Sequence, residues 1–159
     1  MRYHQFIAGW DAEDESFEWE DGRIRQGGTE IVPQAVFDDE LLDYLYDTFR
    51  WIRAQYPDGS EGNGLGSGAY SVIRGRDEIR KLRGMAQAWK NLFGVGPERM
   101  TLTGNYGWTA DPQNGTYEKL FYRKEDLIER FEDLTRVAEH ALENGMDVIR
   151  RQVEEEDEP

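Results

Sequence analysis

With 159 residues and no cysteine, the chain is long enough for one domain with its own core, and it excludes disulfides, thiol nucleophiles and thiolate metal sites. Its 33 acidic and 19 basic residues give a net charge of −14, which disfavours direct binding to nucleic acid or to an anionic membrane surface. No stretch approaches the ~20 apolar residues of a membrane span, and the first residues lack a signal-peptide pattern, so we expect a cytoplasmic protein.

The negative charge is concentrated at the front of the chain. Residues 1–61 hold 15 acidic and 5 basic residues, whereas residues 62–149 are close to neutral, with 13 acids and 12 bases. Residues 11–21 alone contain seven acids and no base. The acidity, with 15 arginines and 4 lysines, also fits a GC-rich genome or adaptation to high salt. Salt adaptation usually spreads acids over the whole surface, so the uneven distribution favours an acidic surface that meets a partner.

The first elements predicted along the chain are a strand and a hairpin. Residues 3–10 are apolar enough for an opening strand. Residues 17–20 then alternate with period two, Asp21 and Gly22 follow, and residues 23–25 resume the alternation. An Asp-Gly pair between two alternating runs predicts a hairpin with a type I′ turn.

A first helix is predicted over residues 38–55, with Asp38 as its N-cap and Pro57 beyond its end. Its buried stripe would consist of Leu41, Leu45, Phe49 and Ile52. Residues 59–68 read Gly-Ser-Glu-Gly-Asn-Gly-Leu-Gly-Ser-Gly and predict a flexible loop or an internal linker.

The second half of the chain alternates between strands and helices. A strand is predicted over residues 69–74, a helix over 76–93, a hairpin from residues 100–108 and 117–123, and a helix over 125–144. Together these elements predict an α+β fold, in which a mainly antiparallel sheet of about five to six short strands packs against three helices.

One domain is expected over residues 1–153. Residues 146–153 extend the third helix or turn away from it, and residues 154–159 are expected to form a disordered acidic tail. A boundary near residue 60 would leave about 60 residues in front, which is marginal for an independent domain.

Two loops resemble ligand-binding patterns without completing them. The stretch 59–68 lacks the spacing of a dinucleotide or phosphate loop, and it precedes a strand instead of joining a strand to a helix. Within 11–21, alternating acids resemble a calcium loop, but Ser16 occupies the position that requires glycine. We therefore expect neither a nucleotide nor a metal ion at these loops.

The sequence also lacks a clear catalytic set. Asp58 with Glu78 would need a lysine, and a strand position for the acid, to form a nuclease-type metal site. His4 and His140 are the only histidines, and no serine has the context of a nucleophile elbow. We expect no cofactor and no catalytic residue, and favour a binding protein over an enzyme, although paired carboxylates could still perform acid–base chemistry.

Two predicted helices carry opposite charges. Asp39, Asp43 and Asp47 recur every four residues, which gives a carboxylate about every 6 Å along a helix, close to the step between phosphates. A possible anion-binding face on the second helix consists of Arg76, Arg80, Arg83 and Lys90. The alternative is that both faces are solvated, or paired with each other or with residues 11–21, where each surface pair contributes only ~0–1 kcal/mol.

Aromatic residues among the acids complete the predicted partner surface. A tryptophan surrounded by carboxylates is typical of an interface anchor with a charged rim, whereas ordinary core packing is the alternative for at least three of the five tryptophans. The candidate partner-binding residues are Asp11, Glu13, Asp14, Glu15, Glu18, Trp19, Asp39, Asp43, Asp47 and Trp51.

We expect a small, non-enzymatic binding protein of prokaryotic or phage type that masks a basic surface of a partner, such as a toxin or a nucleic-acid-acting enzyme. In general character the chain is similar to the immunity proteins of toxin–immunity pairs, which are short, acidic and poor in catalytic motifs. Its acids would steer the partner, and tryptophan or tyrosine anchors would lock it.

Two alternatives stay open. One is a phage-encoded inhibitor that mimics nucleic acid and uses the same acids as phosphate surrogates. The other is a small enzyme that holds an anionic substrate through carboxylates and the Arg76, Arg80 and Arg83 face.

Overall fold

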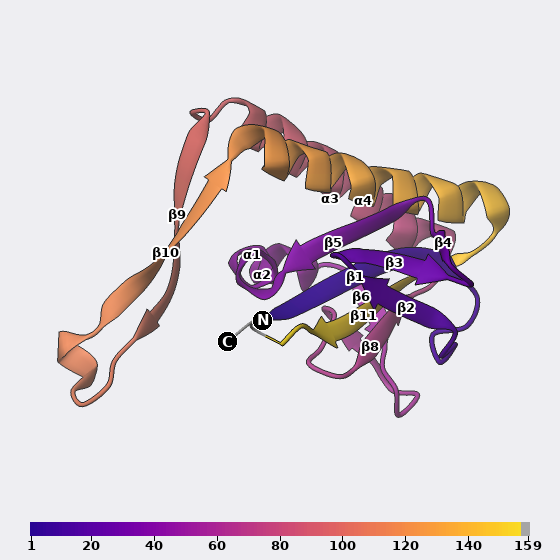
Figure 1. Cartoon of the computed structure of the whole chain (residues 1–159), viewed down its shortest axis with the longest axis horizontal. Coiled ribbons are helices and arrows are strands. Elements are labelled where there is room, and N and C mark those ends of the chain that lie inside the picture. The colour runs from indigo at the N-terminus through magenta and orange to yellow at the C-terminus, as the bar shows by residue number, and fades with distance from the viewer. Residues whose placement is uncertain (157–159) are drawn as a thin grey trace.

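A six-stranded antiparallel sheet forms the centre of the molecule in the computed structural model, which describes residues 1–156 (Figure 1). Its strands are β1 (Arg2–Gly9), β5 (Gln34–Asp38), β6 (Arg53–Gln55), β7 (Glu61–Asn63), β8 (Tyr70–Ile73) and β11 (Asp147–Glu154). They lie in the order β5-β1-β11-β8-β6-β7. The pairing of β1 with β11 runs from Arg2 opposite Glu154 to Gly9 opposite Asp147, so the two longest strands of this sheet lie together at its centre.

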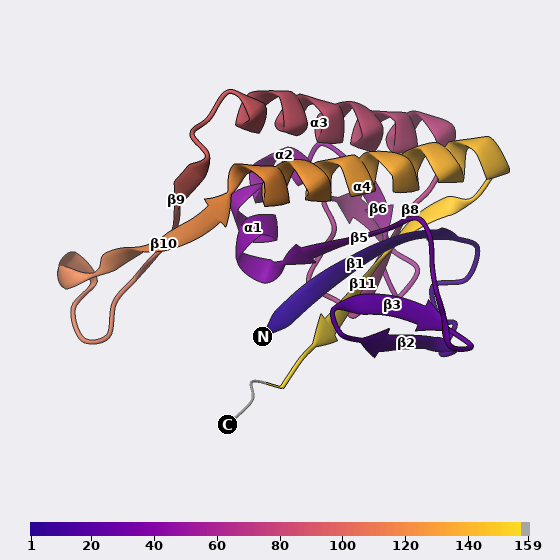
Figure 2. The ribbon, with the colours of Figure 1, turned by 45° about the horizontal axis from the view of Figure 1, so that its top comes forward.

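Two long helices cover one face of this sheet. α3 (Arg76–Gly94) and α4 (Lys124–Asn144) lie side by side and run in opposite directions (Figure 2). The ring of Phe131 on α4 lies 5.6 Å from that of Trp89 on α3 and 6.0 Å from that of Phe37 on β5. The main core therefore sits between the helices and the sheet, and the predicted helices over 76–93 and 125–144 are confirmed.

A small second sheet packs on the opposite face. It consists of β2 (Phe17–Glu20), β3 (Arg23–Gln26) and β4 (Thr29–Glu30). Its Ile24 is fully buried against Ile7 and Ile149 of the large sheet. Asp21 and Gly22 both have positive φ angles, 52° and 72°, as a type I′ turn requires, so the predicted hairpin is confirmed.

The structure corrects the predicted helix over residues 38–55. The segment forms two short helices, α1 (Asp39–Tyr44) and α2 (Tyr46–Phe49), and then the strand β6. The four apolar residues of the predicted stripe are all buried, as expected. The helix ends early because the backbone N–H of Arg53 donates to the Glu78 carboxylate at 2.9 Å and β6 pairs with β7 and β8. Tertiary pairing overrides the helical spacing here.

Part of the glycine-rich stretch 59–68, for which a flexible loop or linker was predicted, joins the sheet. This stretch contains β7, and Leu65 is buried in the main core. The Tyr56 hydroxyl donates to the Gly64 carbonyl at 2.8 Å, and the ring lies against Gly62 and Gly66, where a Cβ atom would approach it to 2.9 and 2.8 Å. The glycines therefore make room for a tyrosine side chain.

A two-stranded ribbon projects from the end of the helical layer (Figures 1 and 2). It consists of β9 (Arg99–Gly107) and β10 (Thr116–Arg123), with a short 3₁₀ helix, η1 (Pro112–Asn114), at its tip. The predicted hairpin is confirmed. On its inner face, Met100 and Leu120 are buried and Leu102 and Tyr122 half-buried, so the side chains near its base pack against the body.

These elements confirm the predicted fold class, α+β with antiparallel sheets in one compact domain. Residues 146–153 were expected to extend the third helix or to turn away from it, and instead residues 147–153 belong to β11. Glu154, the first residue of the expected acidic tail, is the last residue of this strand, and residues 157–159 lie outside the described part of the chain. Within residues 1–156, none of the helices has the length and apolar character needed to cross a membrane.

Candidate functional site

A cavity of about 370 Å³ lies between β1, the α1–α2 segment and the end of the glycine-rich stretch. Its apolar wall is formed by Leu42, Phe49 and Leu65. Its polar wall is formed by His4, Asp39, Asp43, Tyr46 and Ser67, together with Arg2 and Gln152. An apolar wall with a few convergent polar groups is typical of a binding site.

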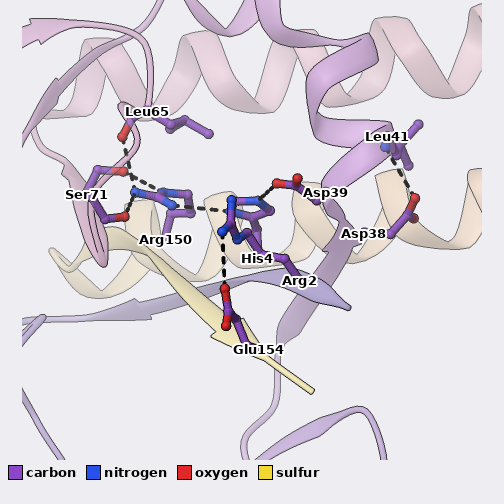
Figure 3. Close-up of polar contacts among 10 residues, drawn as sticks. Arg2, His4, Asp38, Asp39, Leu41, Leu65, Ser71, Arg150 and Glu154 are labelled. Atoms are coloured by element: carbon purple, nitrogen blue, oxygen red, sulfur yellow. Dashed lines mark hydrogen bonds and ion pairs between the residues drawn. The ribbon is translucent and has the colours of Figure 1, made fainter. Parts of the chain in front are cut away.

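A chain of buried polar groups stands behind this cavity (Figure 3). Arg150 of β11 is fully buried, and its guanidinium donates to the Ser71 hydroxyl at 2.9 Å and to His4 Nδ1 at 3.2 Å. The other ring nitrogen of His4, Nε2, lies 2.7 Å from Asp39 Oδ1. This series of hydrogen bonds therefore runs from Ser71 in the core of the sheet to the Asp39 carboxylate on the cavity wall, and it holds that carboxylate in place.

The contacts determine the tautomer of His4. A guanidinium can only donate, so Nδ1 accepts from Arg150 and Nε2 carries the proton that is donated to Asp39. Burial lowers the pKa of His4 despite the raising effect of its hydrogen bond to Asp39. A second proton on Nδ1 would face the Arg150 guanidinium, so this geometry does not suit a general base.

The charge of Arg150 has no carboxylate in direct contact among the described residues. Its remaining donors reach the backbone carbonyls of Leu65 and Gly68, at 3.3 and 2.9 Å. Burial lowers the pKa of Arg150 to about 10. Buried charges are stable only when their hydrogen bonds are satisfied, so this arginine fixes the glycine-rich stretch that forms one side of the cavity.

Asp43 lies one helical turn after Asp39 and lines the same cavity. Desolvation raises the pKa of Asp43, and the neighbouring Asp39 carboxylate raises it further. Asn105 of the ribbon lies beside Asp43 and, acting against this rise, lowers the pKa of this carboxyl. Two of the predicted partner-binding carboxylates are thus brought together, and both are positioned by defined contacts.

A larger cavity, about 620 Å³, lies where the ribbon joins the body. Here the Tyr122 hydroxyl donates to Asp38, the N-cap residue of α1, and the Arg130 guanidinium lies 3.6 Å from Asp38 and 5.4 Å from the Tyr122 ring centre. Burial raises the pKa of Tyr122, and the bond to Asp38 raises it further. The phenol stays protonated, and these groups tie the ribbon to the body.

The acidic stretch 11–21 is partly engaged with the body. Glu13 accepts a hydrogen bond from the Tyr70 hydroxyl at 2.8 Å. The Asp14 side chain closes a turn with Ser16, and its backbone carbonyl accepts from Arg151 at 2.9 Å. The hydrogen bonds from Ser16 lower the pKa of Asp14. These two acids shape the loop before β2.

The other acids of this stretch face solvent, whereas its tryptophan does not. Asp11, Glu15 and Glu18 are exposed and make no ion pair among residues 1–156. Trp19 of β2 is half-buried against the apolar cluster between the small and the large sheet, and its ring lies 5.7 Å from that of Tyr3. Trp19 is therefore held in a packing role, and the exposed part of this stretch is carboxylate.

The remaining predicted partner residues lie apart from the cavity. Asp47 is exposed on α2, so the expected row of three aspartates spans two helices that meet at Leu45. Trp51 is 65% exposed after α2, and its carbonyl accepts from Lys81 at 2.9 Å. A large exposed aromatic ring is thus available near the acidic residues of this segment.

The predicted anion-binding face of α3 is occupied by local contacts. Arg76 donates to a backbone carbonyl near the end of α4, Arg80 pairs with an aspartate of its own helix, and Arg83 is half-buried. Lys90 pairs with Glu132 of α4 at 3.3 Å. None of the four lines either of the cavities described above.

The sequence analysis missed Arg150, the residue that organises the site. A signal was present, because Arg150 falls among the inward positions of an alternating strand, between Val148 and Gln152. No group of histidine or acidic residues in the described part of the chain is arranged to hold a metal ion. Comparison with protein-family models, with curated proteins and with solved structures finds no match to this chain.

Proposed function

We propose that this chain is a non-enzymatic acidic binding protein that masks a basic surface of a partner, as an immunity protein masks a toxin or a nucleic-acid-acting enzyme. The observation that carries the proposal is the pair Asp39 and Asp43 on one cavity wall, beside the half-exposed ring of Tyr46. Two carboxylates and an aromatic ring suit an arginine or lysine side chain of the partner.

Two regions have different roles in this proposal: the exposed acids attract the partner over a long range, and the cavity then binds it. The net charge of −14 and the exposed acids of 11–21 steer a basic partner toward the molecule. The cavity then accepts one basic side chain, for which Asp39 is already oriented by His4. Arg2 also lines the cavity, but it pairs with Glu154 at 3.1 Å.

Masking is better supported than mimicry of nucleic acid. A mimic requires a regular row of carboxylates at phosphate spacing, whereas Asp47 lies on a different helix from Asp39 and Asp43. Masking is also better supported than catalysis, because both ring nitrogens of His4 are engaged and the arginines of α3 line neither cavity.

The test begins with extract of the native host passed over the immobilised protein at low salt. Mass spectrometry of the proteins released by rising salt identifies the partner, and its affinity is then measured for the wild type and for the double variant Asp39→Asn/Asp43→Asn. We expect the double variant to bind about tenfold more weakly or worse, and the wild-type association rate to fall steeply with ionic strength.

A matched control removes the same charge elsewhere. Glu98→Gln/Glu143→Gln changes two exposed carboxylates that line neither cavity and should affect affinity only slightly. Equal losses in both double variants would mean that only net charge matters. Unchanged binding by Asp39→Asn/Asp43→Asn, or binding that is indifferent to salt, would refute the proposal.

A further inference from the structure

The outer face of the ribbon carries an alternating pattern that the acidic body does not share. Along β10, Lys119, Phe121 and Arg123 point to one side, because successive strand residues alternate between faces, and Tyr117 follows beyond a register shift in the pairing with β9. Tyr117 is 59% exposed and Phe121 75% exposed. An aromatic ring and a cation therefore follow one another about every 6.7 Å along an exposed strand.

The neighbouring strand adds a third cation to this face. Arg99 of β9 stands directly opposite Arg123, and both are exposed. Like charges at directly opposed positions destabilise a strand pair, so the ribbon bears a cost that an anionic ligand would remove. The next cross-strand partners on this face are uncharged: Thr101 opposes Phe121, and Thr103 opposes Lys119.

Acidic residues lie beside this face: Asp38, Glu40 and Asp126 line the cavity at the base of the ribbon together with Lys119, Phe121 and Arg123. Glu118 alternates to the inner side of β10, and Asp111 caps η1 at the tip. Among residues 1–156, the acid that pairs with one of these cations is Glu125 of α4, 2.8 Å from Arg123. The side chains of the face itself thus carry a charge of opposite sign to that of the chain as a whole.

The distal half of the ribbon stands away from the acidic body, whereas Arg99 and Arg123 lie at its base. β9 has nine residues and β10 eight, so the ribbon extends about 27 Å at ~3.3 Å per residue (Figures 1 and 2). The Debye length at physiological ionic strength is ~8 Å. Distant acids of the body are therefore screened from the distal part of this face, whereas Asp38, Glu40 and Asp126 line the same cavity as the cations at its base.

We propose that the outer face of the ribbon binds single-stranded nucleic acid. Bases stack on Phe121 and Tyr117, while phosphates contact Lys119, Arg123 and Arg99. Aromatic platforms combined with a line of cations are how proteins hold single strands without sequence preference, and every base offers a ring face for stacking. This site is separate from the Asp39 cavity, so it stands whether or not a basic partner binds there.

The test measures binding of a fluorescein-labelled 12-nucleotide single-stranded RNA, and of the matching DNA, by fluorescence anisotropy at low and at physiological salt. We expect a Kd on the order of 10 µM at low salt, weakening as salt rises. Phe121→Ala should weaken binding about tenfold. Lys119→Gln/Arg123→Gln should weaken it and reduce the slope of log Kd against log salt by roughly 1.4.

Matched controls separate stacking from non-specific attraction. Trp10→Ala removes an aromatic ring that is 69% exposed on the body, and Arg53→Gln removes an exposed cation there, so both should bind like the wild type. Circular dichroism confirms that each variant is folded. Absence of binding at low salt would overturn the proposal, as would equal losses in Phe121→Ala and Trp10→Ala.

A protein occupant would give a different result. If light scattering showed that the wild type self-associates and Phe121→Ala is monomeric, while neither binds oligonucleotide, the face would be a contact between copies and the nucleic-acid proposal would be wrong. Binding that depends on Lys119 and Arg123 but not on Phe121 would likewise remove the stacking role.

Discussion

Replacing the buried arginine tests whether the polar chain behind the cavity holds the domain together. Arg150→Met keeps a long side chain but removes the guanidinium, which donates to Ser71, to His4 and to two backbone carbonyls. All of these acceptors are in the interior or at its edge. Without the guanidinium they lose their donor, while His4 also loses the contact that fixes its tautomer.

The size of the effect follows from two opposing contributions. A hydrogen bond to a charged group contributes at least ~1.5 kcal/mol, so the four bonds of Arg150 contribute ~6 kcal/mol. Burial lowers the pKa of Arg150 to about 10, which corresponds to a cost of ~3 kcal/mol for the charged form. Removing both contributions should destabilise the fold by about 3 kcal/mol.

Urea unfolding, followed by tryptophan fluorescence and circular dichroism, measures this difference. For a chain of this length, 3 kcal/mol corresponds to a fall in Tm of roughly 6–12 °C. Arg150→Lys should be intermediate, since it keeps the charge but reaches fewer acceptors, and Arg53→Met on the exposed β6 should change stability by less than ~0.5 kcal/mol. If the free energy of unfolding of Arg150→Met lay within ~0.5 kcal/mol of the wild-type value, the hydrogen bonds of Arg150 would not stabilise the fold.

Three further changes probe other parts of the structure. Burial lowers the pKa of His4 below 6.5, so the stability due to neutral His4 is fully present above pH 6.5 and is lost as pH falls through the lower folded value. Urea midpoints between about pH 7.5 and 5 should therefore fall more in the wild type than in His4→Gln, and parallel curves would contradict this assignment. Tyr122→Phe removes the hydrogen bond to Asp38 and should cost ~1.5 kcal/mol, with faster amide exchange in the ribbon; unchanged exchange would show that the bond does not secure it. Gly66→Ala places a methyl group 2.8 Å from the Tyr56 ring at a φ of +71°, and should lower stability by ~1–3 kcal/mol in thermal unfolding, an expectation that an unaltered Tm would rule out.

Local signals in the sequence predict much of the fold. The second and third helices follow from apolar residues at helical spacing, and the Asp21-Gly22 hairpin follows from turn chemistry. The first helix fails because Arg53 and its neighbours join a sheet whose other strands are distant in sequence. The strand at residues 61–63 is not predictable from the sequence, because glycines that make room for the Tyr56 ring resemble glycines of a flexible loop.

The candidate site was only half predictable. Asp39 and Asp43 stand out because their charge and spacing are local properties of the sequence. Their partners do not: His4 and Arg150 are 146 positions apart and meet only because β1 and β11 are adjacent strands. The burial of Arg150 is also not expected from the sequence, since charged residues are almost never fully buried unless they are paired.

The position of β11 has a consequence for how the chain reaches its native state. β11 follows every other element of the described chain, yet it lies between β1 and β8 and is the only strand that joins the two halves of the large sheet. During synthesis, β5 with β1 and β8 with β6 and β7 can pair only as separate fragments with open edges until residues 147–154 leave the ribosome. Closure of loops this long is slow, and open edges recruit other strands, so the nascent chain is exposed to aggregation until β11 pairs with β1 and β8.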